Sequence, residues 1–246
     1  MKKILIILSI VAICAGILMA AFFFFFDQAV LLRSGTFYRA NIPEKVVAIT
    51  FDDGPSPVWT PAILDALDKA GIKATFFMLG EHVQKYPKVA KLVAERGHEI
   101  ANHSMHHNNF IYYDKFEVEN DIKDTERAIL EATGVTTQLF RPPKAWLSKR
   151  EKKKIREFGY EVVLWTLNSK DWVNFDDKYI VRYLVKNIQP GDIILFHDSG
   201  GFLKTEEGNR IETVNAIPRL VEKLKGRGYR FVTVSELLEL KKKYEN

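Results

Sequence analysis

The chain has 246 residues and a single cysteine, Cys14, which lies in an apolar run near the N-terminus. The remainder therefore has neither a disulfide nor a catalytic thiolate, so any redox compartment is open to it. A concentrated basic stretch is also missing, because the net charge is only +5 and the lysines are spread along predicted helices. We interpret these lysines as solvated faces and expect no nucleic-acid partner.

Glycine-rich phosphate loops are absent too, since neither GxGxxG nor GxxxxGK[ST] occurs in the sequence. An open nucleotide-binding sheet would need such a loop after its first strand. That position has DDGPSP instead, which argues against nucleotide binding.

One long uncharged segment, Ile4 to Phe26, follows Lys2 and Lys3. As a helix it would span about 35 Å at 1.5 Å per residue, enough for a bilayer. It is longer than the apolar part of a typical signal peptide and has a poor small-x-small cleavage pattern. We therefore expect an uncleaved single-pass anchor in the cell membrane, with a cleaved signal of a secreted protein as the alternative. The paired lysines favour an extracytoplasmic main domain.

After the anchor (residues 1–27) we expect a short polar stem (residues 28–45) and one domain (residues 46–246). In this domain apolar runs with strand character alternate with amphipathic helical stretches. The predicted strands are Val46–Phe51, Ala74–Leu79, Glu99–Asn102, Gln138–Arg141, Glu161–Thr166, Asp192–Phe196 and Arg230–Thr233. The predicted helices are Pro61–Ala70, Pro87–Arg96, Lys115–Thr133, Ser148–Phe158, Asp177–Ile188, Ile211–Lys225 and Ser235–Lys243.

Consecutive βα units predict a parallel sheet, either open and doubly wound or closed into a barrel. Polar residues follow several of the strand ends: Asp52–Asp53, His103–His107, Arg141, Asn168–Asp171 and His197. In a (β/α) barrel the carboxyl ends of the strands surround one mouth, where such enzymes build their sites. We therefore predict an α/β fold, a distorted barrel of about seven parallel strands, in which these residues act together.

The stretch TFDDGPSP ends the first predicted strand with two carboxylates. Side chains of adjacent residues in an extended strand point in opposite directions. One of Asp52 and Asp53 could therefore hold a metal while the other approaches a water molecule. The competing interpretation is an ordinary turn built on Gly54 and Pro55.

Three histidines lie close together in the stretch HSMHH. His103 and His107 have i, i+4 spacing and His103 and His106 have i, i+3 spacing, and either pair can hold one ion. His106 and His107 cannot share a helical face, so the spacing leaves two pairs open. Such a cluster predicts metal binding, and a solvated turn is the alternative.

Three further stretches give weaker signals. In LFRPPK, Arg141 can pair with a carboxylate, although the prolines alone would explain a strand end. In WTLNSKDW, Asp171 could orient a histidine and Trp172 could form a wall for a sugar, or both could belong to a packed strand end. In DIILFHDSG, His197 ends an apolar strand, where a buried histidine bonded to a neighbour is the common explanation.

Together, TFDDGPS, HSMHH, RPP, SKDW and ILFHD resemble the polysaccharide deacetylases, the NodB-homology domain of carbohydrate esterase family four. The resemblance extends from about Val46 to Lys241. It implies that Asp53, His103 and His107 bind a divalent metal, usually zinc, with cobalt or another divalent ion as alternatives. It also settles the choice between the histidine pairs in favour of His107.

The resemblance implies the remaining roles as well. Asp52 would be the general base, held by Arg141, and His197 would be the general acid, tuned by Asp171. A backbone N–H of the RPPKA loop would stabilise the oxyanion. The residues expected to contact the substrate are Trp172, Leu195, Pro143 and Lys144.

Two positions depart from the family pattern. The loop after RPP usually has an aromatic residue followed by glycine, and here it has Lys144 and Ala145. Lys144 can supply the same backbone donor, but Ala145 would be strained if its φ must be positive. Asn168 replaces the first aspartate of the usual DSxDW pattern, whereas Asp171 is retained.

The expected function is metal-dependent removal of acetyl groups from N-acetylglucosamine residues of peptidoglycan or chitin-like oligosaccharides, by an anchored monomer. One alternative is a deacetylase for N-acetylmuramic residues, because Lys144 could attract the lactyl carboxylate of that sugar. A second is a glycan-binding pseudo-enzyme, motivated by the changed loop at Lys144 and Ala145. An iron oxygenase with two histidines and a carboxylate is disfavoured, because Asp52 and His197 would have no role in it.

Overall fold

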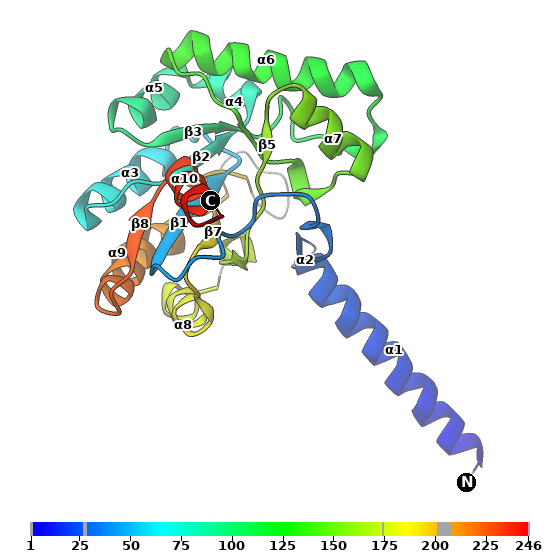
Figure 1. Ribbon diagram of the computed structural model, residues 1–246. Coiled ribbons are helices and arrows are strands. Elements are labelled where there is room, and N and C mark those ends of the chain that lie inside the picture. The colour runs from blue at the N-terminus through cyan, green and yellow to red at the C-terminus, as the bar shows by residue number, and fades with distance from the viewer. Residues whose placement is uncertain (1, 27–28, 174, 201–207, 246) are drawn as a thin grey trace.

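The computed structural model describes residues 2–26, 29–173, 175–200 and 208–245 (Figure 1). At its centre is a sheet whose paired strands are all parallel. The strands are β1 (Val46–Asp52), β2 (Thr75–Met78), β3 (Glu99–Asn102), β4 (Leu139–Phe140), β5 (Glu161–Val162), β6 (Leu167–Asn168), β7 (Asp192–His197) and β8 (Arg230–Val232). They lie in the order β5-β4-β3-β2-β1-β7-β6, and β8 pairs with β1.

Helices surround this sheet (Figure 1). They are α1 (Lys2–Phe26), α2 (Ala29–Leu32), α3 (Trp59–Ala70), α4 (Gly80–Lys85), α5 (Pro87–Glu95), α6 (Lys115–Thr133), α7 (Lys149–Glu157), α8 (Asp177–Asn187), α9 (Ile211–Lys225) and α10 (Val234–Glu245). Short 3-10 turns are η1 (Phe110–Tyr112), η2 (Pro143–Ala145) and η3 (Asp171–Val173). The ends of every predicted helix agree with the structure to within about two residues, and α2, α4 and the 3-10 turns were not predicted.

One predicted strand is wrong. The apolar run Glu161–Thr166 does not form one strand: β5 occupies its first two residues, and β6 begins just after it at the opposite edge of the sheet. Between them the N-terminal segment supplies partners: Phe37 forms a bridge with Val163, and the Arg33 guanidinium donates to the Trp165 carbonyl oxygen at 3.0 Å. The run is apolar because it is buried, and part of its backbone is satisfied by a distant segment that the local pattern does not reveal.

β5 and β6 are thus the two ends of the described sheet, and the chain passes directly from one to the other. The sheet curves into an incomplete barrel, so the predicted fold class of a distorted barrel of parallel strands is confirmed. Its interior contains an apolar cluster that includes Phe77 and Ile193 together with Val234 and Leu237 of α10. The Val234 N–H bonds to Thr75 Oγ1 at the start of β2, so α10 covers the amino-terminal end of the barrel.

The segment after α1 lies against the barrel, and we call it the strap (residues 29–42). Phe37 of the strap is buried. Lys152 of α7 donates to two of its carbonyl oxygens, and Arg39 forms an ion pair with the buried Asp192 at 2.6 Å. Most of the predicted stem is therefore bonded to the wall of the barrel.

α1 extends away from the barrel (Figure 1). Among the described helices it alone is long and apolar enough to cross a membrane, and none of its most apolar window is buried. Membrane anchors and signal sequences both have such a helix. The division of the chain at residues 27 and 45 stays a prediction.

Candidate active site

Polar side chains gather at the carboxyl-terminal end of the barrel, at the ends of β1 and β7 and in the segments after β1, β3, β4 and β6. Asp52 and His197 are paired in register on the adjacent strands β1 and β7, so both strands end at the same level. The structure brings together here the residues that the sequence singled out: Asp52, Asp53, His103, His107, Arg141, Asp171 and His197. They form three connected groups.

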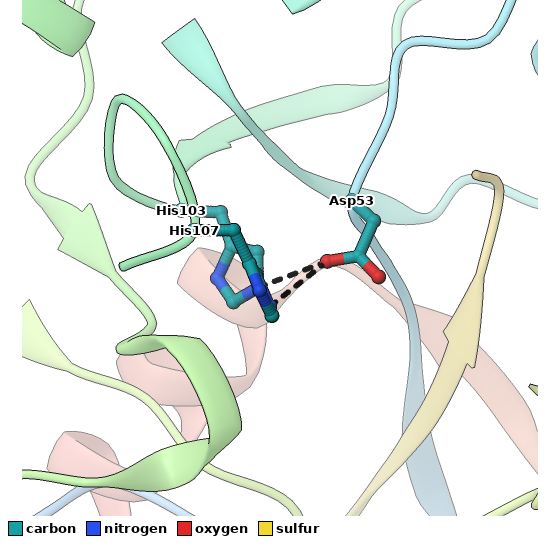
Figure 2. A group of neighbouring side chains, drawn as sticks. All are labelled: Asp53, His103 and His107. Carbon is teal, nitrogen blue, oxygen red and sulfur yellow. Dashed lines mark ion pairs between the residues drawn. The ribbon is translucent and has the colours of Figure 1, made fainter. Parts of the chain in front are cut away.

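Asp53, His103 and His107 form the first group, which we call the triad (Figure 2). Asp53 Oδ1 lies 3.4 Å from Nε2 of each imidazole. This oxygen is buried and has no hydrogen-bond partner within the described part of the chain. One carboxylate oxygen facing two ring nitrogens is a donor set that a divalent metal ion prefers, with positions left for other ligands. The three side chains therefore fit a metal ion.

A further contact orients the ring of His103. Its Nδ1 lies 2.7 Å from the Arg141 carbonyl oxygen, which can only accept, so Nδ1 carries the proton of the neutral ring. The lone pair of Nε2 then faces Asp53, as a metal ligand requires. His107 is held through its backbone N–H, which donates to Ser104 Oγ at 3.1 Å.

His106 lies outside the triad. Its Nδ1 is 3.0 Å from Glu81 Oε2, and its side chain is 53% exposed. His107 has a left-handed φ of 54°, an uncommon conformation for a residue with a β-carbon. This turn separates the directions of the two adjacent rings, so that His107 and not His106 lies beside Asp53.

Charge interactions favour an ionised Asp53. Burial alone would raise the pKa of its carboxyl, but His107, His103 and His197 together hold that pKa well below its ordinary value. For His103, burial lowers the pKa, and the neighbouring Asp52 and Asp53 outweigh burial and raise it. Asp53 is therefore an anion at neutral pH, the form in which a carboxylate binds a metal.

Asp52 and Arg141 form the second group. Arg141 Nη1 donates to Asp52 Oδ1 at 2.6 Å and to Thr50 Oγ1 at 2.8 Å. The guanidinium is fully buried, and its central carbon lies 3.9 Å from the centre of the Phe77 ring. Asp52 Oδ2 lies on the triad side, 3.8 Å from His103 Nε2. The arginine thus holds one carboxylate oxygen and leaves the other near the triad.

His197 and Asp171 form the third group. Asp171 Oδ1 lies 2.8 Å from His197 Nδ1, and Asp171 Oδ2 accepts the His197 backbone N–H at 2.9 Å. Burial works against both charges, but the ion pair prevails: the pKa of Asp171 falls to about 2, and the pKa of His197 rises. The pair therefore favours a protonated imidazole whose Nε2 is directed away from Asp171.

The residues expected to contact substrate belong to the same end of the barrel. Leu195 is buried in β7 two positions before His197 and so points to the same side of the strand. Trp172 is half-buried in η3, and Pro143 and Lys144 belong to η2. Their contacts with a substrate stay a prediction.

The loop after β4 has an unusual backbone. Lys144 and Ala145 have φ angles of 56° and 61°, both in the left-handed region. Ala145 therefore has the positive φ that strains a residue with a β-carbon, at a cost of about 1–2 kcal/mol. The N–H groups of Ala145 and Trp146 bond to the carbonyl oxygens of Pro142 and Pro143.

One buried carboxyl near the mouth was not singled out from the sequence. Asp198 is 1% exposed and accepts the Thr60 hydroxyl at 2.5 Å. Burial raises its pKa to about 7, opposed by the Thr60 bond and helped by the charges of Asp53 and Asp52. Its position directly after His197 in the sequence could have marked it as a candidate site residue.

The start of α9 supplies two more contacts that were missed. The Thr213 hydroxyl donates to Asp171 Oδ2 at 2.8 Å. The buried Arg210 donates to the backbone carbonyl oxygens of Ser199 and Gly200. No local sequence pattern indicates that this helix begins beside the mouth.

Comparison with known proteins agrees with this geometry. The family model described as polysaccharide deacetylase matches residues 39–163. The chain is 43% identical over 200 residues to a peptidoglycan-N-acetylglucosamine deacetylase of Bacillus cereus, which covers 80% of this chain and 90% of that protein. It is 35% identical over 202 residues to the peptidoglycan-N-acetylmuramic acid deacetylase PdaC of Bacillus subtilis, which covers 82% of this chain and 40% of that protein.

Solved structures give the same result. The crystal structure of the Bc1960 peptidoglycan N-acetylglucosamine deacetylase superposes with a TM-score of 0.78 at 32% identity, covering 82% of this chain and 92% of that chain. The family model covers the segments that carry the triad and the Asp52–Arg141 pair. The chain therefore belongs to the polysaccharide deacetylase family, as its motifs indicated.

Proposed function

We propose that the chain is a metal-dependent deacetylase that hydrolyses the acetamide of N-acetylglucosamine residues in peptidoglycan or chitin-like oligosaccharides and releases acetate. The observation that carries this proposal is the meeting of the triad, the Asp52–Arg141 pair and the His197–Asp171 pair at one mouth. Deacetylases of this family are metal-dependent in general, and the relative with 43% identity is named for activity on this sugar.

Asp53, His103 and His107 would hold the metal, and the oxygen of Asp53 that has no hydrogen-bond partner would be one ligand. We propose zinc, because carboxylates and imidazoles are common zinc ligands; cobalt or another divalent ion is the alternative. When bound, such an ion supplies Lewis-acid polarisation of the amide carbonyl and of the attacking water.

Asp52 is the proposed general base. Arg141 occupies Oδ1 and keeps the carboxylate oriented, so Oδ2 on the triad side is the atom that accepts the proton of the attacking water. Asp52 therefore has the fixed direction that a base needs.

His197 is the proposed general acid. An amide nitrogen leaves readily only when it receives a proton as the carbon–nitrogen bond breaks. His197 Nδ1–H is held by Asp171, so Nε2–H is the proton that passes to the departing amine. The products are acetate and a free amino group on the sugar.

The loop after β4 is the proposed source of oxyanion stabilisation, through the backbone N–H of Lys144. A preorganised backbone donor at a developing negative charge contributes strongly to acyl-transfer reactions. Leu195 and Trp172 would surround the acetyl methyl group and the sugar ring, with Pro143 fixing the loop beside them. We propose these residues as the substrate side of the mouth.

A second candidate substrate is the N-acetylmuramic residue of peptidoglycan. The charge of Lys144 lies near enough to His107 to help lower its pKa, although burial is the larger cause. A cation in this place could attract the lactyl carboxylate of muramic acid. The relative with 35% identity is named for activity on that sugar.

Sugar-resolved acetate release tests the proposal. Residues 28–246 are incubated with peptidoglycan and zinc, and free amino groups are then quantified separately on glucosamine and on muramic acid. We expect them on glucosamine. Free amines on muramic acid alone, reduced by Lys144→Gln, would instead support the second candidate. Zinc and glycan binding without acetate release would identify a pseudo-enzyme.

The location of the protein is a separate proposal. α1 would anchor the chain in the cell membrane with the barrel on the extracytoplasmic side, where peptidoglycan lies, and the protein would act as a monomer. Membrane fractionation and protease treatment of intact cells test this arrangement. Recovery of the barrel from the medium would support a cleaved signal instead.

A further inference from the structure

Arg210 is a buried arginine just before α9, and only 2% of it is exposed. Its Nη2 donates to the carbonyl oxygens of Ser199 at 2.8 Å and Gly200 at 2.7 Å, and its Nε donates to Ser199 at 3.2 Å. Its Nη1 makes longer contacts, 3.5 Å to the Asp171 carbonyl oxygen and 3.4 Å to that of Asn209. One guanidinium therefore joins the segment after β7 to η3.

The segment held by Arg210 connects the proposed proton donor with the triad. It runs from His197 to Gly200, where a β-carbon would lie 2.6 Å from Asp53 Oδ2. The backbone at Gly200 thus packs directly on a carboxylate of the triad. In the same segment the Asp198 N–H donates to the Asp52 carbonyl oxygen at 3.1 Å. A shift of this segment would move His197 relative to the triad.

Burying a cation costs free energy unless hydrogen bonds compensate for the lost water. An apolar side chain of similar volume would fill the same space without that cost, but it could not hold carbonyl oxygens in place. The charged groups that act on His197 are Asp171 from η3, Asp53 from the segment after β1 and Arg210 itself. Arg210 therefore lies where it can influence both the position and the surroundings of the proposed acid.

We propose that Arg210 is a positioning residue for deacetylation: by fixing the carbonyl groups of Ser199 and Gly200, it keeps His197 in line between Asp171 and the triad. This inference rests on the proposed function. Arg210 would act on the reacting groups indirectly, through the backbone of Ser199 and Gly200.

The test compares wild type with Arg210→Met, using the full chain purified in detergent and a soluble N-acetylglucosamine oligosaccharide. We expect kcat to fall about 100-fold, the loss that accompanies a misplacement of about 1 Å. KM and bound zinc should stay as in wild type, because the triad and the substrate side are unchanged. Added guanidinium should restore part of the lost kcat of Arg210→Ala. Arg210→Lys should keep only part of the wild-type kcat, because an ammonium lacks the planar fork.

Arg219→Met is the matched control. Arg219 belongs to α9, which begins directly after Arg210, but its side chain is 54% exposed and pairs with Asp177, so its loss should leave kcat unchanged. An unchanged kcat in Arg210→Met would overturn the proposal. So would a loss of kcat that comes with loss of zinc and is not rescued by guanidinium.

Hydrogen exchange gives a readout that does not need activity or the methionine variant. In Arg210→Lys, the Asp198 amide that bonds to Asp52 should exchange faster than in wild type, while amides of α9 beyond its first turn should not. Unchanged exchange at Asp198 would contradict the positioning role. A wild type that releases no acetate would count against the proposed function itself, and the exchange measurement would still decide the role of Arg210.

Discussion

Replacement of Arg141 by methionine tests the account of the proposed base. Arg141 is fully buried, and its guanidinium donates to Oδ1 of Asp52, a residue that is only 3% exposed. Removing one partner of a buried ion pair costs about 3–5 kcal/mol, because the other charge is left without compensation. We expect Arg141→Met to lose this much free energy of unfolding and to release no acetate.

The complementary substitution should be less damaging. In Asp52→Asn the guanidinium keeps three other acceptors: Thr50 Oγ1 at 2.8 Å, the Val163 carbonyl oxygen at 3.3 Å and the Leu164 carbonyl oxygen at 3.4 Å. Its bond to the carboxylate, worth about 1.5–3 kcal/mol, becomes a bond to the neutral amide oxygen of asparagine, worth about 0.5–1.5 kcal/mol. The double variant should lose less than the sum of the single variants, because it leaves no unpaired charge.

Urea unfolding followed by tryptophan fluorescence measures these free energies. The comparison is made after chelation, because an ion beside Asp52 would compensate its charge. Equal losses in Arg141→Met and Asp52→Asn, or a double variant whose loss is the sum of both, would refute the reasoning. Arg127→Met, which removes an exposed ion pair with Asp124, should lose about 0–1 kcal/mol and serves as the control.

Three further predictions follow from the site and the strap. His106→Ala should keep bound zinc after dialysis, whereas His107→Ala should lose it, because only His107 belongs to the triad; the reverse result would mean that the wrong histidine has been assigned. Protonated His197 is the proposed active form, so kcat should fall as pH rises through its raised pKa. Asp171→Asn removes the main group that raises this pKa, so the alkaline limb of the kcat profile should move to lower pH. An alkaline limb that does not move would show that the His197–Asp171 pair is not the proton donor. The chain shortened to the predicted domain, residues 46–246, should unfold at a lower temperature than a chain that keeps the strap, and equal midpoints would show that the strap contributes no stability.

The mouth could be predicted because strand ends in a parallel sheet share one side. Asp52, His103, Arg141 and His197 each follow an apolar run, and the topology then brings them together without further information. The helices were predictable for a similar reason, since their apolar periodicity and capping residues are local. The starts of α6 and α7 have capping boxes in the structure; in α7 the box is formed by Ser148 and Glu151, a pair that is visible in the sequence.

Other features depend on contacts that no local pattern contains. Spacing left His106 and His107 equivalent, and the left-handed backbone at His107 separates them in the structure. The run Glu161–Thr166 has the composition of a strand, but part of its backbone hydrogen bonding is to the strap. Arg210 lies outside the motifs and reaches the mouth only because α9 begins beside η3. Each of these features depends on tertiary contacts between segments that are separate in the sequence.

The central claim is that the metal triad and Asp52 together carry out deacetylation. Its most direct test measures acetate released from peptidoglycan by residues 28–246 before chelation, after chelation and after zinc is returned. The account predicts release that disappears on chelation and returns with zinc, and no release at any stage from Asp52→Asn although that variant keeps its zinc. No release by the zinc-loaded protein, or release by Asp52→Asn equal to wild type, would contradict it.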